Sequence, residues 1–291
     1  MSGPGWRRSM WPRRAAMLAV SLLLLAAAAW LVGSQALLAG WEALTPATIA
    51  AALLLGLVAT SAQSLRWRTL AGQRGMELGW RRALADCYAS SFGNMVLPGG
   101  LGGDAARVAL YRNRGDRRWS SPLLALGAER LSATTVLFAT VAWALLPRSV
   151  PLAAVAATVA LACLAGSAWC MRGLGAGKGL AVWGSSVIGT ASLIALYLAA
   201  MNALGGPVVP VTAVVGLASM SIPLGVGGWG VRELSAGVLA ATMGVTSDHA
   251  VASATAYGLL ATISCLPGMV VLARAWVFRA QGTPRLSPCT R

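Results

Sequence analysis

The sequence contains little charge, and acidic residues are its scarcest part. Charged residues make up only 11% of the 291 residues, whereas soluble globular proteins carry roughly 25%. Eight acidic residues stand against 23 basic ones, and 57% of the chain is hydrophobic. This composition excludes an ordinary soluble domain and predicts an all-α polytopic integral membrane protein.

Histidine and paired cysteines are also nearly absent. His249 is the single histidine, and no second histidine or cysteine stands near it in the sequence. The five cysteines show no CxxC spacing, so nothing suggests a zinc site or a disulfide framework. We therefore expect no metal and no cofactor. No nucleophile and base stand at a plausible spacing, so we also expect no catalytic residues.

The distribution of the basic residues predicts the topology. A net charge of +15 would suggest a nucleic-acid partner in a soluble protein. In a membrane protein, lysine and arginine collect on the cytoplasmic side, so we expect no nucleic acid. Both termini of this multi-pass protein of the cell membrane are then cytoplasmic. We expect a basic cytoplasmic N-terminus at residues 1–14, one transmembrane domain at 15–278 and a disordered cytoplasmic tail at 279–291.

Apolar runs between the basic clusters predict about six full spans. The first run also resembles a signal peptide, but it is long for one, and a loop without lysine or arginine joins it to the next run. Most tryptophans, Trp67 among them, stand near predicted segment ends, as in an aromatic belt. The spans are expected at residues 17–32, 48–65, 123–146, 152–171, 180–204 and 251–273.

Two further segments cannot cross the membrane once, because both ends of each lie on the same side. Residues 83–106 lie between two cytoplasmic arginine clusters, which begin at Arg66 and at Arg107. Residues 207–247 lie between two external ends. We expect both segments to form re-entrant helical hairpins that open from opposite faces and are shielded from lipid.

Each hairpin has a glycine-rich turn with the same pattern. Residues 98–107 (PGGLGGDAAR) and 223–232 (PLGVGGWGVR) share P-x-G-[LV]-G-G-x-x-x-R, which predicts an inverted repeat of the kind found in transporters. A half-helix that follows such a turn would point free amides at an anion. Alternatively, the glycines only permit tight helix packing. The glycines expected to line a cavity are Gly99, Gly100, Gly102, Gly103, Gly225, Gly227 and Gly228.

Ionisable residues at membrane depth are expensive and are usually paired or functional. Asp104 and Arg107 are three residues apart and would share a helix face. Glu129 and Arg130 lie in the third span or at its edge, where a cytoplasmic interface pair is the alternative. The residues expected to bind substrate are Asp104, Arg107, Glu129, Arg130, Trp229, Arg232 and Glu233.

A polar stripe runs along the first hairpin. Asp86, Ser90 and Asn94 follow one another at intervals of four residues, so a helix would present them on one face. Such a stripe would line a wet cavity. Hydrogen bonding between helices is the equal alternative.

With these motifs in this order along the chain, the sequence resembles the lysylphosphatidylglycerol synthase transmembrane family, also called the flippase-like domain family. The resemblance implies a helical unit that moves a modified phospholipid between leaflets. Multi-domain members also carry an aminoacyl-transferase domain, and this chain is expected to be a standalone member that does not make lysylphosphatidylglycerol. The resemblance covers about residues 53–273 and depends on Phe92 to Asn94, Leu97 to Asp104, Arg107, Glu129-Arg130 and Gly227 to Glu233.

These observations favour a lipid flippase or translocator that moves a phospholipid or a lipid-linked glycan. Its partner would be a lipid with an anionic or phosphate headgroup, held by half-helix amides and by Arg107, Arg130 and Arg232. The three carboxylates Asp104, Glu129 and Glu233 would hold those arginines in place. The alternatives are a membrane-embedded enzyme that acts on a lipid phosphate and a non-catalytic partner of an envelope glycosyltransferase or lipid synthase.

Overall fold

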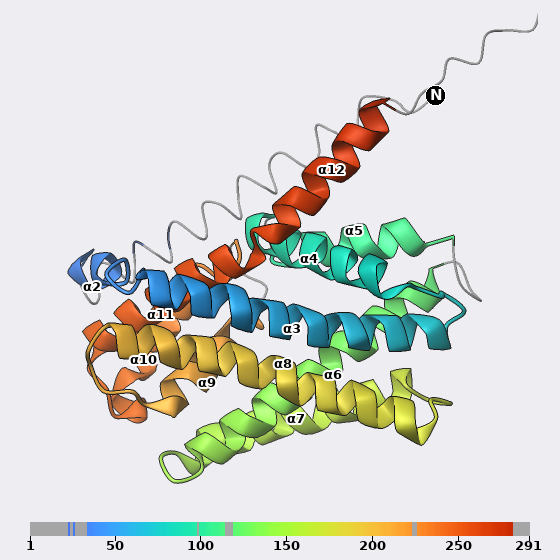
Figure 1. Cartoon of the computed structure of the whole chain (residues 1–291). Helices are drawn as coiled ribbons and strands as arrows, with labels where there is room; N and C mark the ends of the chain where they lie inside the picture. Colours follow the sequence, from blue (N-terminus) through green and yellow to red (C-terminus); the bar gives the residue numbers. More distant parts are fainter. Residues whose placement is uncertain are drawn as a thin grey trace, which may run out of the picture.

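The computed structural model describes residues 34–97, 99–113, 119–222 and 226–281, together with residues 23 and 26. The basic N-terminus at 1–14 and almost all of the predicted first span at 17–32 lie outside these residues. Most of the predicted tail at 279–291 and the glycine Gly225 also lie outside them. All the elements found in the described part of the chain are helices (Figure 1), as the composition predicts.

Five helical stretches are long and apolar enough to cross a membrane. They agree closely with five of the six predicted spans, which confirms a polytopic helical membrane protein. The short helix α2 (Ser34–Ala39) precedes the first of these stretches. The Thr45 side chain caps that stretch, which begins at Pro46. The stretches are α3 (Pro46–Gln73), α6 (Ser120–Leu145), α7 (Val150–Cys170), α8 (Ala176–Ala203) and Ser247–Arg274.

The helix α3 is longer than the apolar run that predicted it. It continues to Gln73, so Arg66 and Arg68 lie within the helix and not in a cytoplasmic loop. Arg66 is buried, and its guanidinium donates a 2.8 Å hydrogen bond to the carbonyl of Ser185 on α8. The expectation that Arg66 marks a loop is therefore wrong, because neighbouring helices shield its charge.

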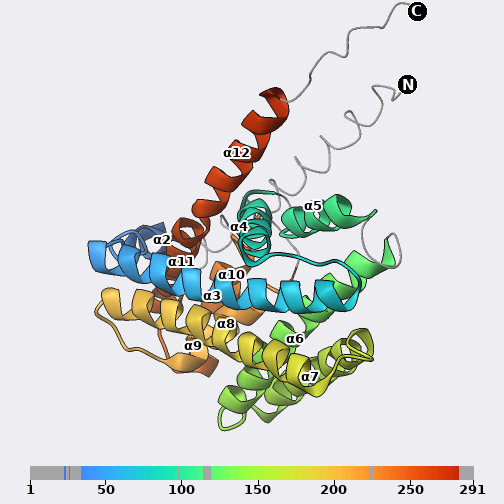
Figure 2. The ribbon, with the colours of Figure 1, turned by 45° about the vertical axis from the view of Figure 1, so that its right-hand side comes forward.

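The last predicted span is two helices. α11 (Ser247–Cys265) ends just before α12 (Pro267–Gln281) begins. Proline lacks the amide hydrogen that a continuous helix needs, and its ring crowds the preceding turn, so the helix breaks at Pro267. Both views show α12 leaving the bundle beside α4 (Figures 1 and 2).

Two pairs of short helices occupy the positions of the predicted hairpins. The first pair is α4 (Trp80–Val96) and α5 (Gly102–Tyr111), and the second is α9 (Pro210–Ser219) and α10 (Val231–Met243). The first hairpin extends beyond the expected residues 83–106.

The two hairpins begin from opposite ends of the bundle. α3 and α8 run side by side in opposite directions, and each leads into one of the hairpins (Figure 1). This arrangement has the polarity that an inverted repeat requires. Entry of each hairpin into the bilayer from opposite faces stays a prediction.

Candidate functional site

The two glycine turns have backbones that only glycine adopts readily. Gly99 and Gly100 have φ values of 81° and 63°, and Gly227 and Gly228 have 59° and 79°. The turns also meet, because a Cβ atom added to Gly227 would lie 2.6 Å from the carbonyl oxygen of Met95. The glycines thus allow a sharp turn in each hairpin and a close approach between the hairpins.

Two other glycines in the motif serve helix packing. A Cβ atom on Gly103 would lie 2.0 Å from the carbonyl oxygen of Ser90, and one on Gly102 would lie 2.6 Å from the Leu97 side chain. The packing alternative therefore holds at both positions. Gly103 also borders a second cavity, described below.

A cavity of about 420 Å³ lies between the two turns. Gly99 and Gly100 line it from the first turn and Gly228 lines it from the second, as the sequence predicts. Arg130 on α6 and Tyr257 on α11 also line it. Both glycine turns therefore contribute to the lining of the cavity.

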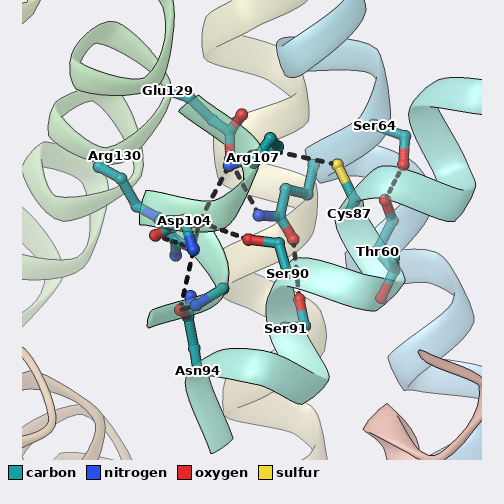
Figure 3. Close-up of polar contacts among 12 residues, drawn as sticks. Thr60, Ser64, Cys87, Ser90, Ser91, Asn94, Asp104, Arg107, Glu129 and Arg130 are labelled. Carbon is teal, nitrogen blue, oxygen red and sulfur yellow. Dashed lines mark hydrogen bonds and ion pairs between the residues drawn. The ribbon is translucent and has the colours of Figure 1, made fainter. Parts of the chain in front are cut away.

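An ion cluster stands beside this cavity (Figure 3). The Arg107 guanidinium lies 3.1 Å from Asp104 and 2.9 Å from Glu129, and Arg130 lies 2.7 Å from Asp104. The Asp104 carboxylate thus stands between two guanidiniums. The cluster joins α5 to α6, and it brings together four residues that the sequence singled out.

Two further residues of the cluster come from α3. Gln63 donates a 2.9 Å hydrogen bond to Glu129, and the Trp67 ring centroid lies 4.5 Å from the Arg107 guanidinium carbon. Trp67 was expected in an interfacial belt, but it is fully buried. Sequence reasoning missed both roles. A glutamine inside an apolar run is the signal that could have identified Gln63.

A second, smaller cluster lies at the second turn. The fully buried side chains of Arg232 and Glu233 form an ion pair, and Glu233 also accepts a 2.7 Å hydrogen bond from the Gly230 amide. The Trp229 and Tyr257 rings lie 4.9 Å and 5.6 Å from the Arg232 guanidinium carbon. The structure thus places Trp229, Arg232 and Glu233 together, as their spacing predicts.

The half-helix amides are largely occupied. The Asn94 side-chain oxygen accepts hydrogen bonds of 2.8 Å and 3.1 Å from the Gly103 and Asp104 amides at the start of α5. At α10, the Glu233 carboxylate takes the corresponding place. The expectation that these amides hold a headgroup is corrected: Asn94 satisfies the first pair, and a carboxylate at α10 would repel an anion.

The polar stripe on α4 faces α5, and two of its residues also border a cavity. Ser90 donates a 2.6 Å hydrogen bond to Asp104, and Asp86 accepts one from Tyr111 and pairs with Arg82 at 3.1 Å. Interhelical bonding therefore holds along the stripe. Asp86 and Ser90 also border a cavity of about 790 Å³ between the first hairpin and α12.

The three arginines predicted to bind a headgroup differ in accessibility. The side chains of Arg107 and Arg232 are 2% and 0% exposed, whereas that of Arg130 is 45% exposed. In this structure, a ligand in the cavity between the turns can touch Arg130. Arg107 and Arg232 are enclosed by their partners in this structure, although Arg107 also borders the cavity of about 790 Å³, so direct binding of a headgroup by these two arginines stays a prediction.

The single histidine has an ordinary structural partner. The His249 ring lies 3.0 Å from the carbonyl oxygen of Pro207, at the loop that leads into α9.

A comparison with protein families matches residues 15–181 to the family described as the lysylphosphatidylglycerol synthase TM region. The match covers more than half of the chain and includes the first glycine turn and the ion cluster, whereas the second turn lies beyond it. No curated protein and no solved structure matches the chain. The matched region contains α3, α6 and α7, the first glycine turn and the buried charges of the ion cluster, and the chain belongs to the lysylphosphatidylglycerol synthase transmembrane-region family.

Proposed function

We propose that this protein translocates a lipid with a phosphate headgroup, either a phospholipid or a lipid-linked glycan, between the leaflets of the cell membrane. The observation that carries the proposal is the half-exposed side chain of Arg130, which lines the cavity between the two glycine turns. Arg130 pairs with Asp104 on one side and borders the cavity on the other. A phosphate in the cavity would complete its coordination.

The charge balance around Arg130 favours an anion. Arg66, Arg107 and Arg130 supply three positive charges, and Asp104 and Glu129 supply two negative ones, which leaves a net charge of +1. Arg66 belongs to this group because it stands one helical turn from Gln63, which contacts Glu129. Unbalanced charge is costly at membrane depth, so a bound phosphate would stabilise the region.

The arrangement of the hairpins suits alternating exposure. The two turns meet beside the cavity, and the hairpins lead away from it in opposite directions. Opening one hairpin would expose Arg130 toward one leaflet while the other hairpin keeps the opposite side closed. The acyl chains would stay in the surrounding lipid, because the outer surface of the helices is apolar.

Reconstitution in vesicles tests this proposal. Purified protein is placed in vesicles that contain phosphatidylglycerol labelled on one acyl chain with a fluorophore, and dithionite added outside quenches the label in the outer leaflet. Translocation raises the quenched fraction above one half. We expect Arg130→Ala to abolish this increase and Arg148→Ala, which removes an exposed arginine just beyond the C-terminal end of α6, to preserve it.

The same vesicles separate the proposal from its alternatives. Chromatography of the extracted lipids would reveal a chemical conversion, which an enzyme acting on a lipid phosphate would produce. A protein that acts only as the partner of a synthase would leave both the fluorescence and the lipids unchanged. Equal quenching with wild type, Arg130→Ala and empty vesicles would overturn the translocation proposal.

A further inference from the structure

The cavity between the turns presents one cationic group among hydroxyl groups and apolar surface. Arg130 supplies the charge, and four hydroxyl-bearing residues also line the cavity. Its remaining lining is apolar side chain or glycine backbone. The hydroxyl-bearing residues are Thr134, Thr190, Ser221 and Tyr257.

Carboxylates are missing from the described lining of this cavity, although three lie in the two neighbouring clusters. Asp104 accepts from Arg107, Arg130 and Ser90. Glu129 is bound by Arg107 and Gln63, and Glu233 by Arg232 and Gly230. Each of the three side chains is at most 4% exposed, so none offers a free surface to a ligand. Residues 98 and 223–225, which lie outside the described part of the chain, are proline, leucine and glycine and carry no carboxylate.

We propose that this cavity selects an anionic headgroup in which the phosphate carries an uncharged, hydroxyl-bearing group such as glycerol or a sugar, and that it rejects headgroups bearing an ammonium. This inference rests on the proposed function and adds to it the class of headgroup that the cavity binds. An ammonium in the cavity would meet the Arg130 guanidinium and the net positive charge behind it, without a carboxylate to pair with. Hydroxyl groups of the ligand would instead exchange hydrogen bonds with the threonine, serine and tyrosine hydroxyls.

The size of the cavity agrees with this class of ligand. At about 420 Å³, it lies in the range of roughly 300 to 1,000 Å³ that is usual for small-molecule sites. It therefore has room for a glycerol phosphate or a sugar phosphate, while the acyl chains remain outside.

Binding measurements test the preference without any transport. Detergent-purified protein is titrated with water-soluble dihexanoyl phosphatidylglycerol and with its lysyl ester, which keeps the same phosphate and carries two ammonium groups on the lysine that esterifies the headgroup glycerol. We expect phosphatidylglycerol to bind at least tenfold more tightly. Equal affinity, or tighter binding of the lysyl ester, would overturn the inference.

A pair of matched variants tests whether charge is the cause. Thr134 stands one helical turn after Arg130 on α6, so Thr134→Asp would place a carboxylate beside the guanidinium. Thr134→Asn makes a similar change of size without the charge, so the ratio between the two variants isolates the charge. We expect the preference for phosphatidylglycerol over its lysyl ester to be at least tenfold smaller in Thr134→Asp. Equal preferences in the two variants would contradict the inference.

A third variant keeps the test decisive if Thr134→Asp does not fold. Arg130→Gln removes the exposed cation, and we expect it to reduce the preference to less than threefold. A preference that survives in Arg130→Gln would show that Arg130 does not set it, which overturns the inference.

The vesicle assay distinguishes failure of this inference from failure of the proposed function. Translocation of both lipids at the same rate would contradict the headgroup preference and leave translocation intact. Absence of translocation for every lipid would contradict the proposed function, while the titrations would still decide which headgroup the cavity binds.

Discussion

The guanidinium of Arg107 lies 2.9 Å from the Glu129 carboxylate, and this ion pair fastens the first hairpin to α6. Both side chains are almost fully buried, and the Trp67 ring covers the guanidinium. Gln63 completes the coordination of the same carboxylate oxygen. A pair so enclosed has given up its hydration, so its contacts within the protein must replace the lost water.

Removing one partner of this pair should destabilise the protein strongly. Arg107→Met leaves Glu129 buried without its counter-charge, and we expect the free energy of unfolding to fall by about 3 to 5 kcal/mol. The double variant Arg107→Met/Glu129→Gln should regain part of this loss, because no unpaired charge remains. Denaturation in detergent measures both. A double variant that is less stable than the single one would contradict the pairing.

The glycine at position 103 should not tolerate a side chain. A Cβ atom there would lie 2.0 Å from the Ser90 carbonyl oxygen, so Gly103→Ala must push α5 away from α4. We expect a lower midpoint of thermal unfolding and weaker translocation. Gly72→Ala in α3 is the matched control, because nothing lies within 4 Å of the added atom. A midpoint for Gly103→Ala equal to that of the control would refute the close contact.

Local patterns were sufficient to predict much of this structure. Apolar runs located five spans, since a helix buried in lipid needs a continuous apolar stretch. Arginine clusters and the repeated glycine motif located both hairpins. The three-residue spacing of Asp104 and Arg107 predicted their contact because those residues share one helix face.

Contacts between elements distant in the sequence were harder to predict. Arg66 was expected in a loop because the apolar run ends before it, yet α8 supplies the carbonyl that binds it. The α5 amides were expected to be free because nothing in the sequence shows that Asn94, which belongs to the preceding helix, reaches them as an acceptor. In both cases the deciding partner is fixed by tertiary packing, which composition and spacing do not report.

The side chain of Asn94 should act as the cap of α5. Asn94→Ala leaves the Gly103 and Asp104 amides without their acceptor, and the loss of a helix cap typically costs about 1 kcal/mol. We expect faster hydrogen exchange at these two amides and a slightly lower unfolding midpoint. Asn202→Ala, at an exposed position of α8, controls for the loss of an asparagine. Unchanged exchange at Gly103 would show that another group caps the helix.

The Arg232 guanidinium fits against α11 only because residue 258 lacks a side chain. A Cβ atom on Gly258 would lie 2.0 Å from an Arg232 terminal nitrogen, so Gly258→Ala must displace the guanidinium from its ion pair with Glu233. Because both charges are fully buried, the separated pair would lack compensation, and we expect a marked fall in the unfolding midpoint. Gly184→Ala in α8, where nothing lies within 4 Å, should leave the midpoint unchanged. The triple variant Gly258→Ala/Arg232→Met/Glu233→Gln removes the charges and should be more stable than Gly258→Ala alone. If the triple variant is no more stable, the cost of Gly258→Ala comes from crowding of the helices and not from the ion pair.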